Sequence, residues 1–296
     1  MIQNKLRGMG VALVTPFKED YSVDYSRLDE ILDFQLEQGT DAIVVCGTTG
    51  EPVTMTTEEK LSVIKYTVDK INGRIPVIAG TGGNSTLSVI EFSKQVEKLK
   101  VDGLLIVTPY YNKATQKGLY AHYSAIASKV QLPIIIYNVP SRTGCNILPE
   151  TVVKLANDFR NIIGIKEASG NISQVAKLAQ LSNGILDIYS GNDNQILPVL
   201  SLGGKGVISV LSNIAPNDVH NMVMEYLNGN TGKALEIQLK YIDLIETLFC
   251  EVNPIPVKAA LNMIGYNVGK LRLPLTELED KHKELLKTEL KKVGLL

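Results

Sequence analysis

The sequence has few of the residues that bind metals or form disulfides. It contains three cysteines and three histidines in 296 residues, and all six are widely separated. An odd number of isolated cysteines does not provide a disulfide framework, and dispersed histidines lack the spacing of a metal site. The sequence therefore predicts no metal and no disulfides, and it favours a reducing, cytoplasmic setting.

The sequence also lacks an excess of charge and any long apolar stretch. Its 30 basic and 31 acidic residues give a formal net charge of −1. Such a chain has no long-range field to attract nucleic acid or an anionic membrane. No stretch approaches the roughly 18 apolar residues of a membrane span, and the N-terminus has no apolar segment typical of a signal peptide. We expect a globular protein that binds neither nucleic acid nor membrane.

What the chain does have is a repeat of short apolar runs, each followed by a segment with helical spacing. The eight runs cover residues 10–17, 41–47, 75–82, 103–109, 133–140, 162–169, 186–192 and 206–213. Eight such units fit a (β/α)8 barrel, which usually takes about 250 residues. Beyond the eighth unit the pattern is helical only. We predict an α/β fold, with a (β/α)8 TIM barrel over 1–228 and a C-terminal helical region over 229–296.

An open, doubly wound sheet is the alternative fold. Its dinucleotide-binding form needs G-x-G-x-x-G, and the nearest sequence, GTGGNS at 80–85, lacks the last glycine. We interpret GTGGNS as a strand-to-helix turn rather than a phosphate-binding loop. Cys46 precedes another glycine-rich turn, so a nucleophilic role is open to it. Free cysteine is more often a small core residue, and we favour that interpretation.

Lys166 lies inside an otherwise apolar run, NIIGIKEASG. The ordinary interpretation is that it reaches water from the end of a strand. Alternation along the strand places Lys166 on a face with small residues, and if that face points into the barrel, Lys166 projects into its centre. Gly164 and Ala168 would share its face, with Ile163, Ile165 and Glu167 on the other. Burial lowers the pKa of a lysine from about 10.4, and the neutral amine can form a Schiff base with a ketone.

Other polar residues fall at the carboxyl ends of the predicted strands, where barrels of this type have their active sites. Tyr137 is a candidate proton shuttle, and Thr48 and Thr49 are candidate donors to a carboxylate. Arg142 offers a planar fork for a second carboxylate. Taken singly, each has a plainer interpretation: a core tyrosine, turn-forming threonines and a surface arginine. Their combination favours an active site.

The motifs GTTGE, TPYYN, YNVPSRTG, GIKEASG, SGND and GVISV together closely resemble the dihydrodipicolinate synthase branch of the N-acetylneuraminate lyase superfamily. The resemblance covers the whole chain and includes the 28 residues between Tyr137 and Lys166. It implies a lyase that needs no cofactor and condenses pyruvate with L-aspartate 4-semialdehyde. The product would be 4-hydroxy-tetrahydrodipicolinate, in the first committed step toward diaminopimelate and lysine. It also implies a homotetramer built as a dimer of dimers.

The resemblance assigns a role to each candidate residue. Lys166 would form the Schiff base with pyruvate, and Tyr137 would donate and accept protons. A proton relay would run from Tyr137 through Thr48 to Tyr111 of an adjacent subunit. Thr49 and its turn would bind the carboxylate of pyruvate, and Arg142 would bind the carboxylate of the aldehyde. Gly191 and Ile208 would contribute backbone carbonyls near the substrate pocket.

Three other functions compete with this one. Another pyruvate-dependent Schiff-base aldolase, acting on a sugar acid or 4-hydroxy-2-oxoglutarate, would use the same Lys166 chemistry. Arg142 favours the synthase, because the sialate lyases have a similar motif, YNIP, that lacks this arginine. If the protein were a non-catalytic regulator on a barrel scaffold, the polar residues at the strand ends would be there by accident. A metal-dependent aldolase would need clustered histidines.

The chain departs from the family at two places. Asn192 stands where many relatives have an aspartate, which puts any electrostatic role there in doubt. The second place is the site where lysine-inhibited relatives bind lysine. Asn84 and Tyr110 are retained there, whereas Thr57 and Lys60 replace frequent histidines and Ser88 replaces an acid. We therefore predict weak or absent inhibition by L-lysine.

Overall fold

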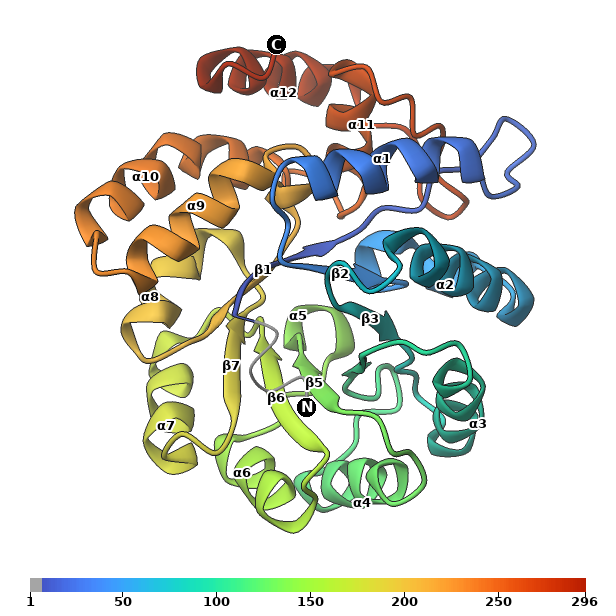
Figure 1. Cartoon of the computed structure of the whole chain (residues 1–296), viewed down its shortest axis with the longest axis vertical. Coiled ribbons are helices and arrows are strands. Elements are labelled where there is room, and N and C mark those ends of the chain that lie inside the picture. Colours follow the sequence, from blue (N-terminus) through green and yellow to red (C-terminus); the bar gives the residue numbers. More distant parts are fainter. Residues whose placement is uncertain (1–6) are drawn as a thin grey trace.

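The computed structural model describes residues 7–296 and contains a closed barrel of eight parallel strands (Figure 1). Each strand overlaps the apolar run predicted for it, and neighbours in sequence are neighbours in the barrel, so the predicted fold class is confirmed. The strands are β1 (Gly8–Ala12), β2 (Ala42–Val45), β3 (Val77–Gly80), β4 (Gly103–Val107), β5 (Ile134–Asn138), β6 (Ile162–Glu167), β7 (Asp187–Ser190) and β8 (Gly206–Ser209).

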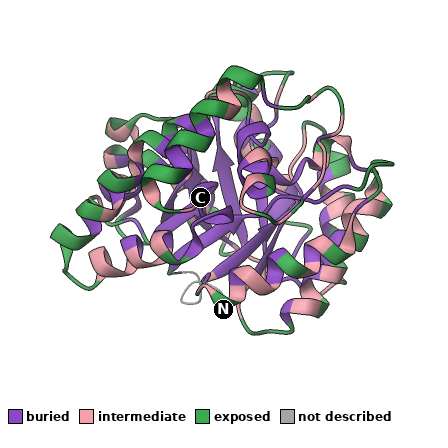
Figure 2. Ribbon diagram, turned by 90° about the horizontal axis from the view of Figure 1, so that it is seen from above, coloured by how far each residue is buried: buried purple, intermediate pink, exposed green. Residues whose placement is uncertain are grey.

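Helices surround the strands in a ring (Figure 1), and the strands at the centre are buried whereas the outer faces of the helices are exposed (Figure 2). The ring consists of α1 (Tyr25–Glu37), α2 (Thr57–Ile71), α3 (Thr86–Glu97), α4 (Gln116–Ala127), α6 (Pro149–Asp158), α7 (Ile172–Ser182), α8 (Ile196–Ser201) and α9 (Pro216–Leu227). A short helix, α5 (Pro140–Thr143), follows β5, and GTGGNS is the turn between β3 and α3, as predicted.

The start of α2 shows how the sequence sets a boundary. Thr56 caps the helix, and Thr56 and Glu59 form a reciprocal capping box. Such a box satisfies two backbone N–H groups that the first turn would otherwise leave unpaired. Glu59 therefore already has a structural role at the helix start.

The barrel interior holds a small apolar core of its own, separate from the larger core between strands and helices. Strand β6 enters this interior with one irregularity. Ile134 pairs with Ile162 but Ile135 pairs with Gly164, so Ile163 is an extra residue in the strand. Ile163 belongs to the interior core, whereas Ile165 belongs to the outer one. The predicted alternation was wrong at Ile163, because a bulge shifts the phase of a strand by one residue.

Three helices follow the barrel: α10 (Thr231–Thr247), α11 (Ile255–Met263) and α12 (Asp280–Val293). Helix α10 packs on α9 and α12, and α11 packs on α12 and on the turn after β8. The predicted helical C-terminal region is present, and the boundary at 228 stays a prediction. Within residues 7–296, no helix is long and apolar enough to cross a membrane. We predicted that the N-terminus has no signal peptide, and the first six residues of that segment lie outside the described residues.

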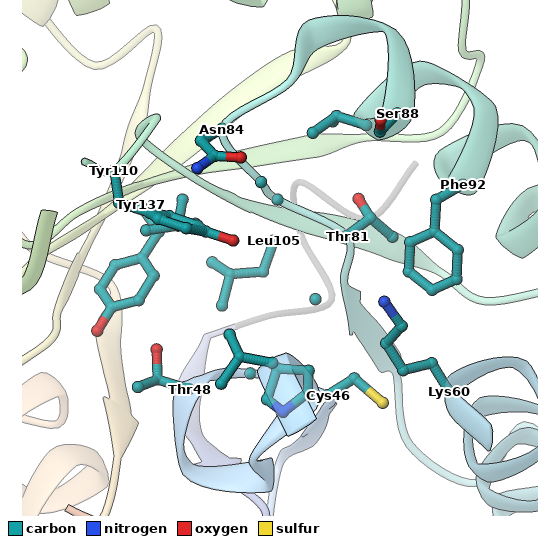
Figure 3. Close-up of a pocket in the computed structure, with 18 of the residues that line it drawn as sticks. Cys46, Thr48, Lys60, Thr81, Asn84, Ser88, Phe92, Leu105, Tyr110 and Tyr137 are labelled. Carbon is teal, nitrogen blue, oxygen red and sulfur yellow. The ribbon is translucent and has the colours of Figure 1, made fainter. Parts of the chain in front are cut away.

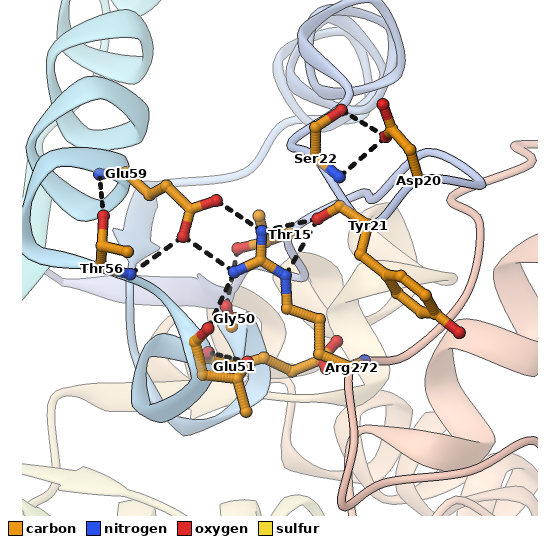
Figure 4. Close-up of polar contacts among 10 residues, drawn as sticks. Thr15, Asp20, Tyr21, Ser22, Gly50, Glu51, Thr56, Glu59 and Arg272 are labelled. Carbon is orange, nitrogen blue, oxygen red and sulfur yellow. Dashed lines mark hydrogen bonds and ion pairs between the residues drawn. The ribbon is translucent and has the colours of Figure 1, made fainter.

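The C-terminal region is bonded to the turn that follows β2 (Figure 4). Lys258 of α11 donates from Nζ to Glu51 Oε1 at 2.9 Å, and both side chains are 1% exposed. The backbone N–H of Arg272 donates to Glu51 Oε2 at 3.1 Å, and its guanidinium bonds Glu59 and the carbonyl of Tyr21. Removing one partner of a buried ion pair typically costs about 3–5 kcal/mol, so these contacts fix the turn firmly.

Candidate active site

Lys166 projects from β6 into the barrel interior and is 5% exposed. Its Nζ lies 4.5 Å from the centre of the Tyr137 ring. Burial lowers the pKa of Lys166 to about 8. The charge of Asp193 raises this pKa in part, and the charge of Arg142 lowers it a little further. Near pH 8 about half of the amine is therefore neutral and nucleophilic.

Tyr137 is the penultimate residue of β5 and is paired with Lys166 in the sheet. The side chain is 6% exposed, and burial raises the pKa of its phenol. The charge of Arg142 and a hydrogen bond to the side chain of Thr48 each lower the pKa of the phenol and so offset part of this increase. The phenol thus stays protonated at neutral pH and can donate a proton near the amine.

Thr48 and Thr49 lie in a 3-10 helix, η2 (Thr48–Gly50), between β2 and the left-handed residue Glu51. Thr15 Oγ1 donates to the carbonyl of Gly50 at 2.7 Å and holds this turn against β1. Thr49 is buried, and its Oγ1 accepts a hydrogen bond from Asn253 Nδ2 at 3.1 Å. The turn presents the two threonines at the carboxyl end of β2.

Arg142 lies in α5, after β5, and its side chain is exposed. One guanidinium nitrogen donates to the carbonyl of Asn253 at 3.0 Å. Its charge lowers the pKa of both Lys166 and Tyr137, because the guanidinium is close to the two groups. An exposed guanidinium at the mouth of a buried site suits a carboxylate on an incoming substrate.

Gly191 follows β7 and lies against the Lys166 side chain. A Cβ at Gly191 would be 2.6 Å from the Cβ of Ala168 and 3.1 Å from the Cε of Lys166. Any larger residue would therefore collide with the strand that carries the amine. Ile208, in β8, has its side chain fully buried in the interior core and its backbone at the same end of the barrel.

A cavity of about 530 Å³ opens at this end of the barrel. Its lining includes Arg142, and it runs from Thr48 and Tyr137 to a side region with Lys60 and Phe92 (Figure 3). The Lys60 ammonium lies 4.7 Å from the centre of the Phe92 ring. Cys46 also borders the cavity, but burial raises the pKa of its thiol to about 12, which confirms the prediction of a core cysteine.

Of the eight candidates, Thr48, Tyr137 and Arg142 line the cavity, whereas Tyr111 points to solvent. Its side chain is 91% exposed, on a backbone with φ of 71°. The other seven candidates (Lys166, Tyr137, Thr48, Thr49, Arg142, Gly191 and Ile208) gather at the carboxyl ends of the strands.

Two polar residues at the site were missed by sequence reasoning. Asp193 is buried, accepts hydrogen bonds from the backbone N–H groups of Val210 and Leu211, and raises the pKa of Lys166. It stands in SGND, where we considered only Asn192, whose side chain bonds Gln195. The second is Asn253, which has no sequence signal because its contacts are more than 100 residues away.

The site combines a buried lysine of lowered pKa, a buried tyrosine beside it and an arginine at the mouth, all on a (β/α)8 barrel. This combination defines a Schiff-base aldolase of the class I type. A family model described as the dihydrodipicolinate synthetase family matches residues 5–293. The chain belongs to this family.

Individual relatives agree along nearly the whole chain. A 4-hydroxy-tetrahydrodipicolinate synthase of Lachnoclostridium phytofermentans is 56% identical over 289 residues, which is 98% of each chain. The structure of dihydrodipicolinate synthase from Thermotoga maritima matches with a TM-score of 0.97 and 45% identity, covering 99% of this chain and all of the other. The enzyme from Acinetobacter baumannii, solved in complex with pyruvate, matches with a TM-score of 0.96 and 44% identity, covering 98% and 100% of the two chains.

Proposed function

We propose that Lys166 forms a Schiff base with pyruvate and that the resulting enamine attacks the aldehyde of L-aspartate 4-semialdehyde. The enzyme is a lyase with 4-hydroxy-tetrahydrodipicolinate synthase activity, which serves diaminopimelate and lysine biosynthesis. The observation that carries this mechanism is the Lys166 amine, 5% exposed and 4.5 Å from the Tyr137 ring. Burial keeps part of the amine neutral, as attack on a ketone requires.

The chemistry needs several proton transfers. The amine adds to the ketone carbon, water leaves, and the methyl carbon of the bound pyruvate then loses a proton to give the enamine. Tyr137, hydrogen-bonded to Thr48, is placed to move these protons. Thr49 and its turn would hold the pyruvate carboxylate, and Arg142 would hold the carboxylate of the aldehyde.

The proposed relay would use a second copy of the chain. Tyr111 is 91% exposed and does not line the cavity of its own chain, so we propose that its hydroxyl reaches Thr48 of a neighbouring subunit. We propose a homotetramer built as a dimer of dimers, in keeping with the closed symmetry of most soluble oligomers. We also place the enzyme in the cytoplasm, a setting that its three free cysteines suit.

Borohydride trapping tests the proposal directly. Incubation with pyruvate and borohydride, followed by peptide mapping, should give one reduced pyruvyl adduct, on Lys166. Because the neutral amine is the nucleophile, the rate of trapping should rise with pH and level off above the pKa of about 8. An adduct on any other lysine would contradict the mechanism. A panel of aldehydes offered to the native enzyme would then check the second substrate.

Arg142→Lys should impair use of aspartate semialdehyde far more than binding of pyruvate. A planar guanidinium can bond both oxygens of a carboxylate, whereas an ammonium acts as a point charge. We expect KM for the aldehyde to rise by about 10-fold or more, the effect of losing a charge-assisted hydrogen bond. Steady-state kinetics with each substrate varied in turn gives the comparison. Equal effects on both substrates would place Arg142 away from the aldehyde.

L-Lysine should inhibit the enzyme weakly or not at all. A cationic ligand in the side region of the cavity would meet Lys60 and find Ser88 instead of an acid. Glu59 cannot readily compensate, because Arg272 and the N–H of Thr56 hold its carboxylate. Activity under saturating pyruvate is measured against lysine concentration, and Ser88→Glu is expected to increase the sensitivity. Half-inhibition of the unmodified enzyme at sub-millimolar lysine would contradict the prediction.

A further inference from the structure

Asn253 contacts both groups that the proposed function assigns to substrate carboxylates. It lies between α10 and α11 and is 5% exposed. Its side-chain amide donates to Thr49 Oγ1 at 3.1 Å, and its backbone carbonyl accepts from the Arg142 guanidinium at 3.0 Å. Thr49 follows β2 and Arg142 follows β5, so one residue of the C-terminal region spans two separate parts of the rim.

We propose that Asn253 is a positioning residue that orients the Thr49 hydroxyl toward the pyruvate carboxylate and fixes the distance from Thr49 to Arg142. This inference rests on the proposed function, because it takes Thr49 and Arg142 as the carboxylate-binding groups. The distance between the two groups limits the length of the substrate pair that can bridge them. Asn253 thereby contributes to the selection of a short dicarboxylic product.

The direction of the hydrogen bond supports this role. A threonine hydroxyl carries a single hydrogen and can both donate and accept. Because Asn253 donates to Thr49 Oγ1, that hydrogen remains available for a substrate carboxylate. Asn253 Oδ1 is buried and has no hydrogen-bond partner within residues 7–296. An unpartnered buried acceptor is unfavourable, so packing alone does not account for an asparagine at this position.

The turn that carries Thr49 is held independently of Asn253. Thr15 bonds the carbonyl of Gly50, and Lys258 and Arg272 bond the carboxylate of Glu51. Loss of the Asn253 side chain should therefore leave the turn in place and change only the direction of the Thr49 hydroxyl and its distance from Arg142. The expected change is in substrate binding, with the fold kept.

Two substitutions at Asn253 test the proposal. Asn253→Ala removes the donor and should raise KM for pyruvate by about 10-fold, the usual effect of one lost hydrogen bond. Asn253→Asp keeps the shape of the side chain, but its carboxylate accepts the hydrogen of the Thr49 hydroxyl. It also adds a negative charge beside the substrate carboxylate, so KM for pyruvate should rise by about 100-fold. For both variants kcat should change by less than about threefold, because the lost interaction holds substrate and transition state alike.

A double-mutant cycle separates an action through Thr49 from a general loss of structure. Thr49→Val removes the hydroxyl at constant shape. In that background Asn253→Ala should change KM for pyruvate by less than about twofold, since the shared hydrogen bond is already gone. Multiplicative effects of the two substitutions would overturn the proposal.

Asn161→Ala provides the matched control. Asn161 precedes β6 at the opposite end of the barrel, and its Nδ2 donates to the carbonyls of Ala127 and Val130, both at 3.0 Å. This variant should lose thermal stability and keep both KM values. Failure of borohydride trapping in the unmodified enzyme would overturn the proposed function. Normal trapping with unchanged KM values in both Asn253 variants would overturn this inference alone. If Asn253→Ala does not fold, the isosteric Asn253→Asp decides.

Discussion

Lys166→Ala is expected to lower the rate of condensation by about 10³-fold or more, as removal of a covalent nucleophile does in other enzymes. The Lys166 amine is the only group of the site that we propose to form a covalent bond to pyruvate, and the lysine is almost fully buried. Initial rates of product formation, followed over long times at high enzyme concentration, measure the residual activity. The variant should also give no borohydride adduct with pyruvate.

The fold of the Lys166→Ala variant is expected to be retained. Removal of a cation from a buried site takes away a desolvation cost as well as the attraction to Asp193. Circular dichroism and thermal unfolding check this point. Lys205→Ala is the matched control, because Lys205 is an exposed lysine just before β8, at the other end of the barrel. Residual activity above a few hundredths of the control would argue against a Schiff base at Lys166.

Tyr111→Phe is expected to lower activity by about 10² to 10⁴ fold, the usual contribution of a positioned proton donor. If the hydroxyl acts in a neighbouring subunit, mixing two inactive proteins should restore activity. A hybrid of Lys166→Ala chains and Tyr111→Phe chains contains sites with an intact lysine from one chain and an intact tyrosine from the other. Co-expression with two different tags, purification of the hybrids and rate measurement test this.

Hybrid formation must be shown separately by mass spectrometry of the intact assembly. Tyr226→Phe, in α9 and away from the cavity lining, controls for loss of a tyrosine hydroxyl as such. Confirmed hybrids that stay inactive would mean that Tyr111 acts within its own subunit or has no role in the relay. The exposure of Tyr111 would then need another explanation.

The strands and the polar rim could be predicted because they depend on local signals. Apolar runs such as GLLIVTP mark a strand buried on both faces, and parallel strands bring their carboxyl ends to one edge whatever the details of packing. Alternation over a few residues placed Lys166 on one face of its strand with small neighbours, and the structure buries that side chain. Such inferences need no knowledge of distant parts of the chain.

The features that were missed depend on packing between distant parts of the chain. The extra residue at Ile163 is set by pairing with β5, and the sequence around it reads as an ordinary strand. Asp193 is polar in a polar turn, so nothing local shows that its carboxylate is buried near Lys166. The pairing of Glu51 with Lys258 could not be predicted either, since each charge alone suggests a surface position.

The long-range bonds of the C-terminal region affect the order in which the enzyme becomes competent during its synthesis. Thr49 and Asn253 are 204 residues apart, and Glu51 and Lys258 are 207 apart. At about 5–20 residues per second, the ribosome exposes Lys166, Tyr137 and Arg142 several seconds before Asn253 leaves the exit tunnel. A nascent chain that ends at α9 has the proposed nucleophile and all eight strands, but not the contacts that we propose to align Thr49 and Arg142. We therefore expect full activity toward the two substrates only after translation is almost complete.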